Sequence, residues 1–219
     1  MATGTKVKTT VAPLKWVFIT GEGRNNAMPG EEPRMQYTAS VLVEANSPEH
    51  KAFQAQIDTE WKRYKDQFGV KGLPKTNGMK TFMVESDDKK DIDPATEKVR
   101  KVDSGKVLIT FKTNTTWPDG NSQVVKVFDG KGRDITAAVH AAGWSIGDES
   151  TGIIHGTALG NNVGGTHKIT LYLSAVQLAK LVKYEGSSVD AEDIGGEEID
   201  LGDAVEAITV PTNTEGPAL

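Results

Sequence analysis

The fold class of this chain follows from two stretches, Lys106-Val-Leu-Ile-Thr-Phe-Lys-Thr-Asn114 and His167-Lys-Ile-Thr-Leu-Tyr-Leu-Ser174. In the first stretch the apolar residues Val107, Ile109 and Phe111 alternate with Lys106, Thr110 and Lys112. In the second, Ile169, Leu171 and Leu173 alternate with Lys168, Thr170 and Tyr172. A period of two is typical of a strand with one face packed inward and the other facing solvent or ligand. Both stretches are therefore predicted to be strands of a sheet whose outer face carries cations and a ring.

Strands are also predicted elsewhere, from β-branched and aromatic runs bounded by turn residues, at Leu14–Thr20, Arg34–Glu44, Thr81–Glu85, Gln123–Asp129 and Thr151–Leu159. The glycines between Gly156 and Gly165 resemble a phosphate loop, but a hairpin turn between two strands accounts for them better.

Helices are fewer. Ser47 is predicted to cap a long helix that Gly69 ends, with an apolar stripe at Phe53, Ile57, Trp61, Tyr64 and Phe68. Residues 134–142 predict a short helix, and Ser174 with Gln177 forms a capping box for a final helix over 175–183. The expected fold class is a β-rich α+β domain, compatible with a partly open barrel.

Charge is distributed unevenly along the chain. Residues 1–184 hold all 25 Lys and Arg with 20 acids, whereas residues 185–219 hold ten acids and no base. Such asymmetry suggests a nucleic-acid binder with an acidic arm, or else an ordinary domain with a solubilising tail.

The outer strand faces repeat one pattern of cations beside aromatic residues: Lys106 and Lys112, then Lys126 with Phe128, then Lys168 with Tyr172. Single-stranded nucleic acid fits this pattern, because bases stack on rings while ammonium groups neutralise phosphates. The competing interpretation is that the rings pack under a loop and the lysines are ordinary surface charges.

Loops add further candidates for nucleic-acid binding. Trp117 lies in a turn and either anchors its own loop or stacks on a base; Trp16 is either core or stacking platform. The basic loop residues are Lys71, Lys75, Lys80, Lys131 and Arg133.

Signals for catalysis are weak. The run Gly143-Trp-Ser-Ile-Gly147 matches a nucleophile elbow in letters, but no strand-turn-helix context is predicted around it. His155 and His167 could meet across the predicted hairpin, yet two ligands make a weak zinc site. The absence of Cys excludes thiolate metal sites and fits a reducing cytosol. We therefore expect no enzyme activity, cofactor or metal site.

Two stretches, Lys106–Ile135 and His155–Tyr184, resemble the single-stranded DNA-binding proteins of tailed bacteriophages. The resemblance implies an OB-fold, a five-stranded barrel with one long and one or two short helices, over residues 1–184, and an acidic, disordered tail over 185–219. It implies sequence-nonspecific binding and protection of single-stranded DNA during phage replication and recombination, in the cytoplasm of the infected bacterial host. The protein would be a monomer or homodimer with no membrane association.

The resemblance also implies a role for the tail, which would compete with DNA for the binding groove and recruit replication proteins such as a polymerase or helicase-primase. The tail residues expected to do so are Asp190, Glu192, Asp193, Glu197, Glu198, Asp200, Asp203 and Glu206. Related tails often end in an aromatic residue, whereas this chain ends Glu215-Gly-Pro-Ala-Leu219. The alternative function is a non-enzymatic phage structural or accessory module with a solubilising tail.

Overall fold

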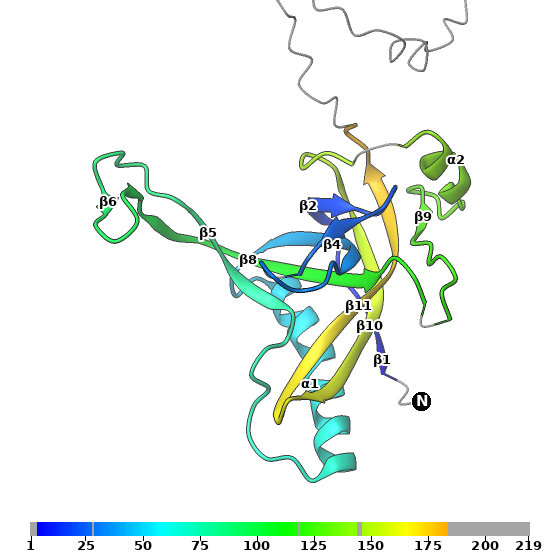
Figure 1. Ribbon diagram of the computed structural model, residues 1–219, viewed down its shortest axis with the longest axis horizontal. Helices are drawn as coiled ribbons and strands as arrows, with labels where there is room; N and C mark the ends of the chain where they lie inside the picture. The colour runs from blue at the N-terminus through cyan, green and yellow to red at the C-terminus, as the bar shows by residue number, and fades with distance from the viewer. Residues whose placement is uncertain (1–3, 28, 118, 144–145, 184–219) are drawn as a thin grey trace, which may run out of the picture. The chain divides into compact units, whose positions relative to one another are not determined.

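The computed structural model describes residues 4–27, 29–117, 119–143 and 146–183. These residues form two helices, α1 (Pro48–Phe68) and α2 (Thr136–Ala141), and eleven strands (Figure 1). The strands are β1 (Thr5–Lys8), β2 (Ala12–Phe18), β3 (Arg24–Asn25), β4 (Met35–Glu44), β5 (Met79–Glu85), β6 (Ile92–Asp93), β7 (Lys98–Val99), β8 (Lys101–Asn114), β9 (Lys126–Phe128), β10 (Thr151–Val163) and β11 (Thr166–Lys180).

Five of these strands close a barrel in the order β2-β4-β8-β11-β10 and back to β2. β2, β4 and β8 form an antiparallel meander, and β8 meets β11 in parallel at the pair Lys112 and Tyr172. β10 closes the ring where Gly152 pairs with Ala12. This connectivity is that of an OB-fold, so the predicted fold class is confirmed.

The core is built from the inward residues that the period-two patterns predicted. Leu14, Val41, Phe111, Ile154 and Leu173 are all 2% exposed or less. Complete burial of such a side chain stabilises the fold by about 1.5–3 kcal/mol. The alternation in the sequence therefore assigns the inner faces of the stretches 106–114 and 167–174 correctly.

Helix α1 covers one end of this core and follows the prediction closely. The Ser47 side chain accepts a hydrogen bond from the backbone N–H of His50, and Gly69 ends the helix with φ of 65°. Four residues of the predicted stripe are buried, but Phe68 at its end is 54% exposed. Trp61 belongs to the core, as predicted, and its Nε1 donates to the Gly72 carbonyl at 2.9 Å.

Glycines on the inner face of β10 let two rings approach the strand closely. A Cβ added to Gly156 would collide with the Phe111 ring, and one added to Gly160 would collide with the Tyr64 ring. The hairpin to β11 then turns through Gly164 and Gly165, with φ of 58° and 79°. The predicted hairpin is confirmed, and these glycines serve strand packing and the turn.

The predicted final helix over 175–183 is wrong, because β11 continues as a strand to Lys180. Val176 pairs with Ile154 of β10 on one side and with Val127 of β9 on the other. A register shift in β10–β11 leaves Ser174, the expected cap, without a pairing partner, so both Ala175 and Val176 are buried. The shift breaks the period of two, and sheet pairing on both sides outweighs a short helix that is marginal alone.

Other boundaries differ from the predictions as well. The strand expected over 123–129 is confined to β9, and the strand expected from Lys106 begins at Lys101. Lys80, predicted in a loop, lies on β5. β5 and the first half of β8 form a long hairpin arm that extends from the barrel, with β6 and β7 at its tip (Figure 1). No helix in the described part of the chain is long and apolar enough to span a bilayer.

Candidate functional site

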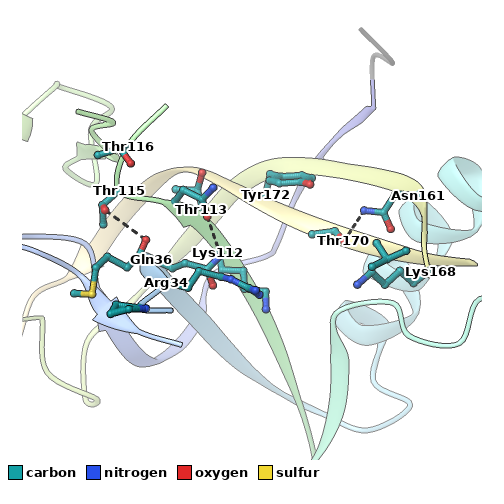
Figure 2. Close-up of a pocket in the computed structure, with 14 residues that line it drawn as sticks. Arg34, Gln36, Lys112, Thr113, Thr115, Thr116, Asn161, Lys168, Thr170 and Tyr172 are labelled. Atoms are coloured by element: carbon teal, nitrogen blue, oxygen red, sulfur yellow. Dashed lines mark hydrogen bonds between the residues drawn. The ribbon is translucent and has the colours of Figure 1, made fainter. Parts of the chain in front are cut away.

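Two adjoining depressions lie on the outer face of the barrel, and together we name them the barrel groove. The first has a volume of about 690 Å³ and lies between the start of β4, the end of β8 and the β10–β11 hairpin (Figure 2). The second, about 650 Å³, extends from there over β8 towards β5 and β2. Both are lined by Lys112, Lys168 and Thr170, so the two depressions are continuous.

The lining of the barrel groove is cationic. Its cations come from β3, the residue before β4, the loop before β5, and strands β5, β8 and β11: Arg24, Arg34, Lys75, Lys80, Lys112 and Lys168. No acid is among the described lining residues, and none of these cations forms an ion pair with an acid of the described chain.

Lys112 lies at the centre of this charge. Burial, followed by repulsion from Lys168, Arg34 and Lys80, holds the pKa of Lys112 below its ordinary value near 10.5. We name these four residues the cation cluster. Figure 2 shows Arg34 and Lys112 close together, with Lys168 further along the same depression. Because the three neighbouring cations contribute to this shift beside burial, an anion bound here would relieve repulsion that the folded protein carries.

Strand register brings a ring next to this cluster. Tyr172 pairs directly with Lys112 across β11 and β8, and its side chain is 39% exposed on the outer face. On the other side of Lys112, Thr38 of β4 is its partner. The outward positions of three neighbouring strands therefore present a hydroxyl, an ammonium group and a ring side by side.

A second ring is displayed by a local irregularity in β2. Trp16 has φ of 51°, unusual for a residue with a Cβ, and its backbone N–H donates to Asp148 Oδ1 at 3.0 Å. Asp148 also binds Lys15 Nζ at 3.1 Å, so one carboxylate holds both residues of the bulge. Trp16 is 44% exposed and lines the barrel groove, and its ring centroid lies 5.9 Å from that of Phe82. The alternatives of core and platform are thus resolved in favour of a surface position.

Two residues that line the groove each have a buried side-chain oxygen without a hydrogen-bond partner in the described chain. These oxygens are Thr38 Oγ1 and Asn161 Oδ1. The Asn161 amide nitrogen is held at 3.0 Å by Thr170 Oγ1 (Figure 2), which leaves its carbonyl oxygen as the orphan. An unsatisfied buried polar atom costs about 1–3 kcal/mol, and a polar ligand in the groove could remove that cost.

Of the residues predicted to bind nucleic acid, the groove collects Trp16, Lys75, Lys80, Lys112, Lys168 and Tyr172. It does not include Lys71, Lys106, Trp117, Lys126, Phe128, Lys131 and Arg133. Lys106 is paired with Glu44 at 3.3 Å.

The predicted basic turn at residues 128–133 is organised around an acid. Asp129 accepts from the backbone N–H groups of Lys131 and Arg133 and from Arg133 Nε at 2.6 Å. These bonds lower the pKa of Asp129. Phe128, partly buried on β9, pairs with Gln177, well beyond Tyr172 along β11. The turn is therefore separate from the groove.

Two arginines in the groove were missed by the sequence predictions. Arg34 has the same parity as the polar Gln36 and Thr38, so the alternation of polar and apolar residues within the predicted strand 34–44 could have placed it on the outer face. Arg24 lies on β3, and its guanidinium carbon lies over the Phe18 ring, 5.4 Å from the ring centroid. No local pattern predicted that contact.

The remaining predicted sites are not supported or lie elsewhere. His155 pairs with Ala175 and His167 with Asn162, so these histidines do not meet across the hairpin. Instead, Nδ1 of His167 lies 3.0 Å from the Tyr64 hydroxyl oxygen. No cluster of three potential metal ligands occurs among the described residues. Ser145 and the acidic tail residues lie outside the described residues.

Comparison with solved structures identifies similar folds. The single-stranded DNA-binding protein of bacteriophage Enc34, in complex with single-stranded DNA, matches with a TM-score of 0.53 and 15% identity, covering 83% of this chain and 90% of that one. Gp2.5, a single-stranded DNA-binding protein encoded by bacteriophage T7, matches with a TM-score of 0.51 and 13% identity, covering 90% and 100%. Neither a protein-family model nor a curated protein sequence matches the chain. At these identities the likeness establishes the fold.

Proposed function

We propose that the protein binds single-stranded DNA along the barrel groove without regard to base sequence, as a coating protein and not as an enzyme. The observation that carries the proposal is the cation cluster, unpaired with any described acid, next to the exposed ring of Tyr172. The similar folds of two phage single-stranded DNA-binding proteins, one of them in complex with single-stranded DNA, support it.

In this proposal the phosphates of the strand lie against Arg34, Lys80, Lys112 and Lys168, while bases stack on Tyr172 and Trp16. Stacking tolerates any sequence because every base has a π face, and alanine replacement of such a ring typically costs about 1–3 kcal/mol per base. At the floor of the groove, the Thr38 hydroxyl would donate or accept a hydrogen bond, and the Asn161 amide oxygen would accept one.

The salt dependence of binding tests the role of the cations. Each phosphate contact on a single strand contributes about −0.7 to the slope of log affinity against log salt, so Lys112→Ala/Lys168→Ala should reduce the slope by about 1.4. The measurement is fluorescence anisotropy with labelled oligo-dT at several salt concentrations.

The control for this experiment is Lys126→Ala/Lys131→Ala, which removes two exposed lysines outside the groove. An unchanged slope in the groove variant, or a protein that binds duplex as well as single strands, would contradict the proposal.

The proposal includes a role in phage DNA replication and recombination, in the cytoplasm of the infected bacterial host. The ten acids after Tyr184 would compete with DNA for the cations of the groove and recruit replication proteins. A tethered segment experiences its own binding site at an effective concentration of order mM, so weak attraction is enough for competition.

Truncation after Tyr184 is expected to tighten binding of oligo-dT, most strongly at low salt, because screening weakens the competition as salt rises. The measurement compares dissociation constants of the full-length and truncated chains at low and high salt. Equal affinities at low salt would show that the tail does not compete.

A further inference from the structure

The outer face of β11, β10 and β1 carries polar and basic residues beyond the barrel groove. Tyr172 pairs with Lys112 on one side and with Thr157 of β10 on the other, and Thr157 in turn pairs with Lys6 of β1. All four positions face outward, since each inner neighbour, such as Val7 or Leu173, is buried. With strands about 4.8 Å apart, this row leads from Lys112 to Lys6 over about 14 Å.

At the far end of this row lies a third depression of about 390 Å³. It is lined by Lys6, Val7, Lys8, Gln56, His155, Gly156, Thr157 and Ser174. The register shift that leaves Ser174 unpaired coincides with this hollow. We name it the β1 depression.

The β1 depression has the same charge character as the barrel groove. Lys6 and Lys8 are exposed, and neither forms an ion pair with an acid of the described residues. No acid is among its described lining residues. His155, the backbone pairing partner of Lys8, also lines the depression and adds a polar group.

β1 is held firmly enough to present these lysines at fixed positions. Gln56 of α1 accepts from the Lys8 backbone N–H and donates to the Lys8 carbonyl, both at 3.0 Å. At the other end of the strand, Glu60 accepts from the Thr5 N–H and hydroxyl at 3.2 and 2.7 Å. Val7, between the two lysines, is only 4% exposed. A rotation of the β1 backbone that turned Lys6 and Lys8 away from the surface would therefore expose Val7.

We infer that a single strand bound in the barrel groove continues past Tyr172 and over Thr157 onto β1, where Lys6 and Lys8 neutralise further phosphates. This inference rests on the proposed function and extends it to a second basic sector. The ligand chemistry is that of a phosphodiester backbone, because the lining of the β1 depression offers cations and hydrogen-bonding groups but no Phe, Tyr or Trp ring. Long strands would use both sectors, and short strands only the groove.

The test uses the full-length chain with labelled oligo-dT of about 6 and about 16 nucleotides, lengths towards the short and the long end of OB-fold site sizes. For the longer strand, Lys6→Ala/Lys8→Ala should reduce the slope of log affinity against log salt by about 1.4. Between 50 and 200 mM salt, the variant should therefore lose about sevenfold less affinity than wild type loses. For the shorter strand, the variant should match wild type. Lys6→Arg/Lys8→Arg should retain the slope on the longer strand.

The control is Lys51→Ala/Lys62→Ala, which removes two exposed cations of α1 that line neither sector. If wild type and Lys6→Ala/Lys8→Ala both bind the longer strand with the same steep salt slope, the extension to β1 is wrong and the groove proposal stands. If wild type binds neither strand, both fail. Equal losses on short and long strands would also overturn the extension, because they would place the lysines within the first sector.

Discussion

Tyr172→Ala is expected to weaken binding of oligo-dT by about 1–3 kcal/mol, which corresponds to about 5- to 150-fold in the dissociation constant. Tyr172 pairs with Lys112 of the cation cluster, and it is exposed in the first of the two depressions. A base stacked on it would keep the neighbouring phosphates next to Lys112 and Lys168. The measurement is anisotropy at one fixed salt concentration.

Two further variants make this experiment specific. Tyr172→Phe keeps the ring and should bind within a few-fold of wild type. Trp117→Ala removes a more exposed ring, 53% exposed, that does not line the groove, and should lose less affinity than Tyr172→Ala. If Tyr172→Ala binds like wild type, the ring is not a stacking platform.

Glu60→Ala is expected to destabilise the fold by about 1–3 kcal/mol, the cost of leaving a buried donor without a partner. Glu60 is fully buried and binds three elements: Arg63 of α1 at 2.7 Å, Thr5 of β1 at 2.7 Å, and the backbone N–H of Gly160 on β10 at 2.8 Å. Its loss would leave the Gly160 donor without a partner and detach the end of β1.

Urea unfolding measures this loss through the transition midpoint and its slope. The matched control is Asp66→Ala on the same helix, which breaks an exposed ion pair with Lys62 and should cost no more than about 0.5 kcal/mol. A Glu60→Ala midpoint close to that of Asp66→Ala would show that the buried carboxylate contributes little.

Acid should reveal the same contribution from Glu60. Burial raises the pKa of Glu60, but hydrogen bonds from Arg63, Gly160 and Thr5 together lower it below its ordinary value near 4.5. A folded-state pKa below the unfolded value means that the stabilisation is present above about pH 4.5 and is lost as pH falls through the folded pKa. The stability difference between wild type and Glu60→Gln should therefore shrink in that acidic range.

The site could be predicted only in part, as two lysines show. Lys112 and Lys126 both alternate outward in predicted strands beside a ring, and the sequence does not distinguish them. In the structure Lys112 lies among three other cations, whereas Lys126 lies on the short strand β9 beside the far end of β11. Which cations gather depends on which strands become neighbours, and that depends on pairing between residues far apart in the chain.

Local sequence determined those features whose causes are local. The helix from Pro48 to Phe68 follows from its cap, its apolar spacing and Gly69; the inner faces of the strands follow from their alternation; and the β10–β11 turn follows from Gly164 and Gly165. Tertiary structure alone decided that β11 continues through Ala175 and Val176, and that Arg34, Lys112 and Tyr172 meet. The physical reason is that backbone pairing on both edges of a strand, and charge brought together by barrel closure, are interactions between distant segments that no local pattern contains.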